Sequence, residues 1–126
     1  MNIKILVAAH KKYRMPEDKI YFPVQVGSYG KENIGFARDD EGDNISQKNP
    51  YFCELTGLYW IWKNVDADYY GLCHYRRYLL NEQEKIFTEA EYLELLKCYE
   101  LITTKRVVLN NSYHYGFATN HNIHAL

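Results

Sequence analysis

The apolar positions at the start of the chain form an almost unbroken run. It extends from Ile3 to Ala9 and is interrupted only by Lys4. A run of this kind is typical of a strand that is buried on both faces of a parallel sheet. A second apolar segment, Ile20 to Val26, contains Pro23, which has no N–H to donate to a strand ladder. The pattern therefore predicts a first buried strand, followed by an edge strand or an extended loop.

The middle of the chain changes from an irregular segment to a clear helical pattern. From Arg14 to Asn49 prolines and glycines recur without periodicity, and so long an irregular stretch in a small domain is typically functional. Asn49 is a favourable N-cap, and Pro50 suits the first helical position. The apolar residues that follow at helical spacing are Phe52, Leu55, Tyr59 and Trp62. We expect a mostly buried helix from Pro50 to about Asn64.

The second half of the predicted domain contains a strand, a helix and a further short strand. Tyr69 to Tyr75 follows the turn Asp66-Ala67-Asp68 and predicts a strand. Thr88 to Glu91 is a capping box, and it opens a helix with apolar residues on one face. That face consists of Tyr92, Leu95, Leu96 and Tyr99. Glu100 to Thr103 is expected to form a short strand, and Val107 to Leu109 is a weaker strand candidate.

This order of elements is typical of a layered α/β domain with a mainly parallel sheet, here a single domain over residues 1–126. In such sheets, ligands bind beyond the carboxyl ends of the strands. Three basic segments are expected at that edge: His10 to Lys12, His74 to Tyr78 and Thr103 to Arg106. The edge is therefore predicted to hold a small anionic ligand.

Composition narrows the functional classes. Fifteen Lys and Arg against sixteen Asp and Glu give a net charge of −1, which argues against nucleic acid as a partner. The apolar runs are too short for a membrane span. The three cysteines are widely spaced within apolar runs, so we expect reduced core residues in a cytoplasmic protein. Aromatic residues make up 16% of the chain, including 13 tyrosines. This content indicates partly solvated surfaces, or a face that further protein would cover.

Two motifs carry candidate chemistry, and each has an ordinary structural alternative. The segment from His74 to Tyr78 places a histidine and two arginines between tyrosines. It could hold a diphosphate while the rings stack on a base or sugar, or it could be a basic strand edge that pairs with nearby acids. The acidic segment from Arg38 to Ser46 could bind a cation or sugar hydroxyls, or it could be a solvated turn, although it does not match a calcium loop.

Other candidate metal and catalytic residues have weaker support. Asp66-Ala67-Asp68 matches the D-x-D pattern of metal-dependent sugar transferases, but it precedes a strand, so we read it as a polar turn. Glu54 is one turn into the predicted helix, where it could also simply favour the helix N-terminus. The three late histidines, His114, His121 and His124, are too loosely spaced to be metal ligands. No metal ligands are therefore predicted, and a divalent cation is kept only as an alternative cofactor.

Several motifs, in this order, resemble the DUF4422 domain. They are Ile5 to Tyr13, Met15-Pro16, Gly42 to Ser46, Asn49-Pro50, Tyr51 to Asn64 and Tyr70 to Tyr78. The resemblance covers most of the first 105 residues. It implies a GT-A-like, Rossmann-like fold and a bacterial glycosyltransferase of capsular or exopolysaccharide synthesis. Family domains run past the end of this chain, so we expect a shortened member or a fragment.

The resemblance also suggests which residues form the site. All but Lys11 of the residues named next occupy the family's characteristic positions. The expected catalytic residues are Asp43, Glu54 and His74, and the expected substrate-binding residues are His10, Lys11, Asn44, Asn49, Tyr75, Arg76 and Arg77. We expect the His10 region to meet the nucleotide, the two arginines to meet the diphosphate, and Asp43 or Glu54 to meet the sugar. Positioned Arg and His side chains can stabilise a departing diphosphate without a metal.

The implied reaction moves a sugar from a nucleotide sugar, with a UDP-sugar as the first expectation, to a glycan or lipid-linked glycan. It would take place in the cytoplasm or at the inner face of the membrane, with peripheral membrane contact or an oligomer as further expectations. The alternative is a catalytically incomplete nucleotide- or glycan-binding module that needs a partner chain. A phosphate-binding regulatory domain is a third reading.

Overall fold

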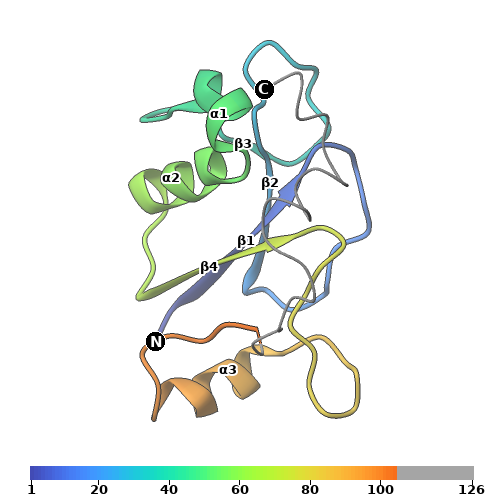
Figure 1. The fold of residues 1–126 in the computed structure, drawn as a ribbon, viewed down its shortest axis with the longest axis vertical. Helices are drawn as coiled ribbons and strands as arrows, with labels where there is room; N and C mark the ends of the chain where they lie inside the picture. Colours follow the sequence, from blue (N-terminus) through green and yellow to red (C-terminus); the bar gives the residue numbers. More distant parts are fainter. Residues whose placement is uncertain (105–126) are drawn as a thin grey trace, which may run out of the picture.

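The computed structural model describes residues 1–104 of the chain, and it shows a parallel sheet with helices on both faces (Figure 1). The elements are β1 (Ile3–Ala9), β2 (Tyr21–Gln25), β3 (Ala37–Arg38), the 3-10 helix η1 (Ser46–Lys48), α1 (Asn49–Phe52), α2 (Leu55–Asn64), β4 (Tyr69–His74) and α3 (Glu89–Leu96). The strand order is β3-β2-β1-β4, and every neighbouring pair is parallel. The predicted α/β class with a mainly parallel sheet is confirmed.

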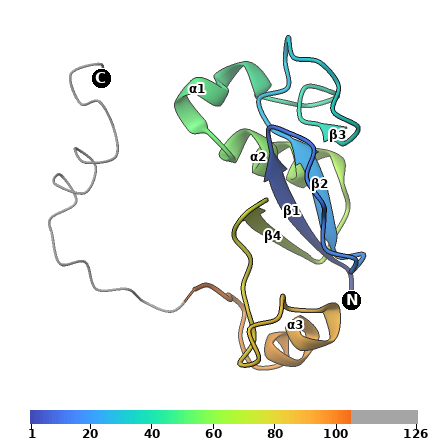
Figure 2. The ribbon, with the colours of Figure 1, turned by 90° about the vertical axis from the view of Figure 1, so that its right-hand side faces the viewer.

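β1 lies at the centre of the sheet, and its alternating side chains form two separate cores. On one face Leu6 and Ala8 pack with Trp60 and Ile61 of α2. On the other face the neighbouring β1 residues pack in a second core that includes Tyr92 of α3. Figures 1 and 2 show that α2 and α3 lie well apart from each other around the strands. Because both faces of β1 are covered, the unbroken apolar run of the sequence is explained.

β2 is an internal strand, so the prediction of an edge strand or loop at Pro23 was wrong. The register explains why proline is tolerated there. Val26 donates its N–H to Ala9 on the β1 side, whereas the Gln25 carbonyl accepts from Asp39 on the β3 side. By alternation the nitrogen of Pro23 also faces β3, but β3 pairs only with Val24 and Gln25. The missing N–H therefore interrupts no ladder hydrogen bond.

The predicted helix from Pro50 to Asn64 is interrupted at Cys53. This residue has a φ of 51° and divides the segment into α1 and α2. Asn49 is the first residue of α1 rather than its N-cap, whereas Pro50 lies in the first turn as expected. The predicted buried stripe was also wrong: Leu55 and Trp62 are half-exposed. The residues of α2 that are buried are Thr56, Gly57, Trp60 and Ile61.

In the second half of the domain, one predicted strand and one predicted helix are confirmed, although Tyr99 of the predicted apolar helix face lies beyond α3 and is 60% exposed. β4 follows the expected turn, and Thr88 forms the capping box with Glu91 at the start of α3. Glu100 to Thr103, in contrast, has no strand partner and is not a strand. The strand candidate Val107 to Leu109 lies outside the described residues. Among residues 1–104, no helix combines the length and apolarity that a membrane crossing needs.

The three cysteines are free thiols, as predicted, but only one of them is in the interior. Cys73 is partly buried in β4, and Cys53 and Cys98 are exposed. The expectation of three core cysteines was therefore wrong. Cys53 is at the surface because the chain turns there between the two helices.

Candidate functional site

The carboxyl ends of β1 and β4 bring together two of the three predicted basic segments. Ala8 is level with His74 in the parallel register, and the Tyr75 amide donates to the Ala8 carbonyl at 3.1 Å. The residues after each strand therefore emerge side by side at one edge of the sheet. His10 and Lys11 are exposed in the turn after β1. Of the third segment, Thr104 lies near this edge, while Lys105 and Arg106 lie outside the described residues.

A first cleft of about 570 Å³ opens beyond the ends of β1 and β2. Its lining residues are His10, Gln25, Val26, Gly27, Lys31, Glu32, Ile34 and Asn49. Gly27 has a φ of 62°, and a Cβ at this position would lie 2.5 Å from the side-chain amide of Asn49. The backbone at Gly27 can therefore approach Asn49 only because it carries no side chain.

Asn49 is fixed in this cleft by its own hydrogen bonds. Its amide nitrogen donates to the Cys53 carbonyl at 2.8 Å and to the Thr56 hydroxyl at 3.1 Å. Both contacts fasten the α1 segment to the start of α2. The side chain therefore forms a rigid wall of the cleft, and its remaining hydrogen-bonding capacity is limited.

A second cleft of about 300 Å³ lies at the end of β4 and contains two of the predicted catalytic residues. Glu54, at the N-terminus of α2, and His74, at the end of β4, line it together with Arg77 and Thr104. Burial lowers the pKa of His74, and Arg76, His10 and Arg77 act in the same direction, whereas Glu54 opposes them. The imidazole is therefore held towards its neutral form, which can accept a proton.

The side chains after β4 form an aromatic and cationic cluster. Tyr75 stacks on Tyr13 with ring centroids 4.0 Å apart and an interplanar angle of 18°. The ring of His74 lies 4.1 Å from that of Tyr75, and the Arg76 guanidinium lies 5.1 Å from the Tyr75 centroid. Arg77 turns back, with its amide donating to the His74 carbonyl at 2.8 Å. The predicted residues His74 to Arg77 therefore form one compact cluster around the strand end.

Asp43 lies apart from the other two predicted catalytic residues. Its carboxylate accepts from the Tyr59 hydroxyl at 2.8 Å, and its carbonyl accepts from Asn64, the last residue of α2. Glu54 precedes the other end of this helix, about 15 Å away at about 1.5 Å per residue. The structure therefore brings Glu54 and His74 together but not Asp43.

Asn44 acts within its own loop. Its amide donates to the carbonyls of Asp40 and Gly42, and its oxygen accepts from the Ser46 amide. All its polar atoms are thus engaged in shaping the turn. This arrangement gives Asn44 a local structural role and leaves it little capacity to bind sugar hydroxyls.

Asp39 organises the edge and was missed as an individual residue by the sequence reasoning. It is fully buried, and its carboxylate accepts five hydrogen bonds. The donors are the Gly27 amide, the Ser28 amide and hydroxyl, the Ser46 hydroxyl and the Thr56 hydroxyl, at 2.6–3.0 Å. Asp39 thus ties the end of β2 to η1 and to α2, and so fixes the walls of the first cleft. In the sequence nothing separates it from its acidic neighbours, Asp40 and Glu41.

Arg38, next to Asp39, is engaged in the loop between β2 and β3 and does not itself line either cleft. Its guanidinium pairs with Asp40 at 3.1 Å and donates to the Ser28 and Lys31 carbonyls. The Arg38 guanidinium lowers the pKa of the Asp40 carboxyl. This partly buried pair therefore stabilises the loop that carries Lys31 into the first cleft.

The acidic motifs do not assemble a metal centre in the described part of the chain. Within residues 1–104, no three His, Cys, Asp or Glu side chains lie close enough to share an ion. Asp68 of the D-x-D sequence accepts from the Asn2 amide at 2.6 Å, next to the start of β1. The motif is therefore at the opposite edge of the sheet, and its reading as a turn agrees with the structure.

These features define an α/β domain with basic and aromatic side chains gathered at the carboxyl ends of β1 and β4. The model of the family "Domain of unknown function (DUF4422)" matches residues 4–126, so the chain belongs to that family. A solved structure described as "WbbM bifunctional glycosytransferase apo structure" is similar at 47% identity with a TM-score of 0.60. The match covers 63% of this chain and 14% of that chain, so this chain corresponds to a small part of WbbM. No curated protein matches the sequence.

Proposed function

We propose that this domain binds a nucleotide sugar and takes part in the transfer of its sugar to a surface glycan. A UDP-sugar is the first proposed donor. The observation that carries the proposal is the basic edge, where His10 and the cluster from His74 to Arg77 adjoin two clefts. The similarity to a structure described as a glycosyltransferase supports the same class. Capsular or exopolysaccharide chains are the proposed acceptors.

The nucleotide is assigned to the first cleft and the diphosphate to the two arginines that follow β4. The side-chain oxygen of Asn49, held in place by the hydrogen bonds of its amide nitrogen, is assigned as an acceptor for a base or a ribose hydroxyl. Arg76 and Arg77 are assigned to the diphosphate because guanidinium groups bind phosphate oxygens in pairs. The stacked pair of Tyr13 and Tyr75 offers an aromatic edge to the base or sugar, and Lys11 adds positive charge at the rim.

Bond cleavage at the sugar carbon transfers negative charge to the departing diphosphate. Arg76 and Arg77 are proposed to stabilise that charge electrostatically. Glu54 and the neutral form of His74 share the second cleft, where either can accept the proton of an acceptor hydroxyl. Asp43 is not assigned a step because it lies at the far end of α2. A divalent cation bound with the donor is compatible with this assignment.

Titration calorimetry with UDP, UDP-glucose, UDP-galactose and GDP-mannose tests this function. We expect binding of at least one nucleotide sugar, and hydrolysis or transfer of its sugar when an acceptor glycan is present. Failure of every nucleotide sugar to bind, with and without Mg²⁺ or Mn²⁺, would refute the proposal. The expected setting is the cytoplasm, at the inner face of the membrane.

A second candidate function is a binding module that becomes active with a partner chain. The observation in its favour is β4, which pairs on one side only within the described residues yet has no Lys, Pro or acidic residue to protect its edge. Donor binding without turnover, and turnover restored by a partner polypeptide, would support this function over the first.

A further inference from the structure

The break between α1 and α2 at Cys53 lies between the two clefts. Cys53 has a φ of 51° and a ψ of −130°, a backbone conformation that is strained for any residue except glycine. Such a residue keeps its conformation only where the surrounding contacts hold it. Asn49, four residues before Cys53, lines the first cleft, and Glu54, directly after it, lines the second. The contacts that hold Cys53 therefore affect both clefts.

Asn49 holds both polar backbone groups of Cys53. The Cys53 amide donates to the Asn49 backbone carbonyl at 2.8 Å, and the Asn49 side-chain amide donates to the Cys53 carbonyl, also at 2.8 Å. We call these two hydrogen bonds the Asn49 clamp. The sequence pattern alone predicts one uninterrupted helix through this point. The break is therefore imposed by the clamp rather than by local helix propensity.

The Asn49 clamp is anchored in the interior of the domain. The side-chain amide of Asn49 also donates to the Thr56 hydroxyl at 3.1 Å, and this hydroxyl donates to the Asp39 carboxylate at 2.7 Å. Thr56 and Asp39 are both fully buried. A satisfied polar network in the interior is rigid, so the side chain of Asn49 has a fixed support.

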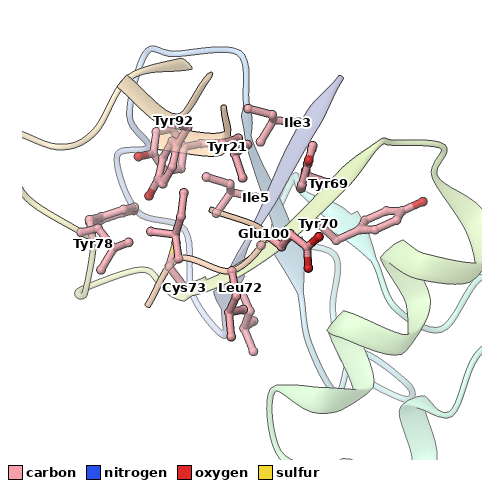
Figure 3. A pocket seen from close by; sticks show the side chains of 15 residues that line it. Ile3, Ile5, Tyr21, Tyr69, Tyr70, Leu72, Cys73, Tyr78, Tyr92 and Glu100 are labelled. Atoms are coloured by element: carbon pink, nitrogen blue, oxygen red, sulfur yellow. The ribbon is translucent and has the colours of Figure 1, made fainter. Parts of the chain in front are cut away.

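Glu54 enters α2 directly after the strained residue. Its φ of −61° and ψ of −16° are already helical, so the turn that brings the chain to this position is made at Cys53. The opposite wall of the second cleft is β4, on which Figure 3 labels Leu72 and Cys73. His74, the last residue of β4, completes that wall. The conformation of Cys53 therefore determines how the chain presents Glu54 to His74.

We propose that Asn49 is a positioning residue for the second cleft: it holds Cys53 in the strained conformation and so keeps the Glu54 carboxylate beside His74. Without the clamp, Cys53 returns to a helical φ and α1 continues into α2, which changes the surroundings of Glu54. The same side chain of Asn49 lines the first cleft, so one residue supports both clefts. The role of Glu54 as a proton acceptor rests on the proposed function, whereas its placement does not.

The test follows the pKa of His74 in the free protein by NMR of the imidazole nitrogens. Burial lowers this pKa, and the charge of Glu54 opposes the lowering. Asn49→Ala should therefore lower the pKa further, by at least half of the shift that Glu54→Gln produces. The double variant should show no more than the Glu54→Gln shift, because both changes remove the same interaction. Asn49→Ser, with a side chain too short to reach Cys53, should repeat the result.

Cys53→Gly separates the clamp from a general loosening of the fold. Glycine adopts a positive φ without strain, so Cys53→Gly added to Asn49→Ala should restore at least half of the lost pKa, and alone it should change nothing. Asn81→Ala is the matched control, because the Asn81 side chain also organises a turn, by accepting from two backbone amides. It should leave the His74 pKa at the wild-type value.

Three results would overturn the proposal. They are a wild-type His74 pKa in folded Asn49→Ala or Asn49→Ser, an equal shift with and without Cys53→Gly, and an equally large shift in Asn81→Ala. UDP titrations of the same samples keep this proposal apart from the proposed function. Failure of UDP to bind would refute the donor site alone, because the His74 titration needs no ligand.

Discussion

Asp39 shows how one buried carboxylate can fix the shape of the loops at one edge of a sheet. Five donors from three separate segments converge on it. Asp43, which the sequence analysis named as the catalytic acid of this segment, is exposed, and its carboxylate accepts one hydrogen bond, from Tyr59. The two residues have the same chemistry but opposite surroundings, so their substitutions should differ sharply.

We predict that Asp39→Ala destabilises the domain by roughly 3 kcal/mol or more, because it leaves several buried donors without an acceptor. Asp39→Asn should cost less, since one oxygen remains. Urea denaturation followed by circular dichroism measures both effects. Asp43→Asn is the matched control and should leave the denaturation midpoint unchanged; a midpoint shift as large as that of Asp39→Asn would argue against this role for Asp39.

His74 should make stability depend on pH. Its pKa in the folded protein lies below the ordinary value of 6.5, so the unfolded chain binds more protons in the interval between the two values. Stability contributed by the neutral ring is therefore complete above about pH 6.5 and declines as the pH falls towards the folded pKa. Urea midpoints between pH 5 and pH 7.5 should show this slope, and His74→Gln should flatten it.

Glu54 provides the matched test of the electrostatics, because it opposes the lowering of the His74 pKa. Glu54→Gln should move that pKa further down, as followed by NMR of the imidazole nitrogens. Glu94→Gln, on α3, should leave the His74 resonance unaffected. An unchanged His74 pKa in Glu54→Gln would contradict the placement of the two side chains in one cleft.

At the scale of elements, α2 approaches the sheet closely through Gly57. A Cβ at this position would lie 2.5 Å from Val26 Cγ1 and 3.2 Å from Leu6 Cδ1. Helix propensity alone would favour alanine by about 1 kcal/mol. Both neighbours are fully or almost fully buried, so neither can move away without disturbing the core. The packing therefore outweighs the propensity.

Gly57→Ala is expected to destabilise the domain by about 1–3 kcal/mol, the usual cost of overpacking a core. Thermal unfolding measures it. Gly30→Ala is a useful comparison, because Gly30 has a φ of 74° and open space around its Cα. Its cost should be limited to backbone strain, about 1 kcal/mol. Stabilisation by Gly57→Ala would show that α2 can move off the sheet.

The elements with strong local patterns were predictable from the sequence. β1 followed from an unbroken apolar run, and the start of α3 followed from the capping box at Thr88. Other features depend on contacts distant in sequence: the internal place of β2 results from a two-residue β3 that carries almost no pattern. The face of α2 that is buried is likewise set by Gly57, whose small size lets the helix pack there.

At the scale of the whole molecule, topology explains why the site was partly predictable. Parallel strands place His10 and His74 at one edge, and this follows once both strands are recognised. The position of Asp43 could not be predicted in this way, because it depends on the path of an irregular loop along α2. The role of Asp39 is also a property of the assembled fold, since its donors come from residues 27–56.

The central claim is that the edge formed after β1 and β4 binds the diphosphate of a nucleotide sugar. The most direct measurement is calorimetry of UDP binding to the wild type, Arg76→Ala, Arg77→Ala and the control Lys97→Ala, whose lysine is on the surface next to α3. The account predicts that each arginine variant weakens binding at least tenfold and that Lys97→Ala matches the wild type. Absence of UDP binding by the wild type, or equal affinity in all four proteins, would contradict it.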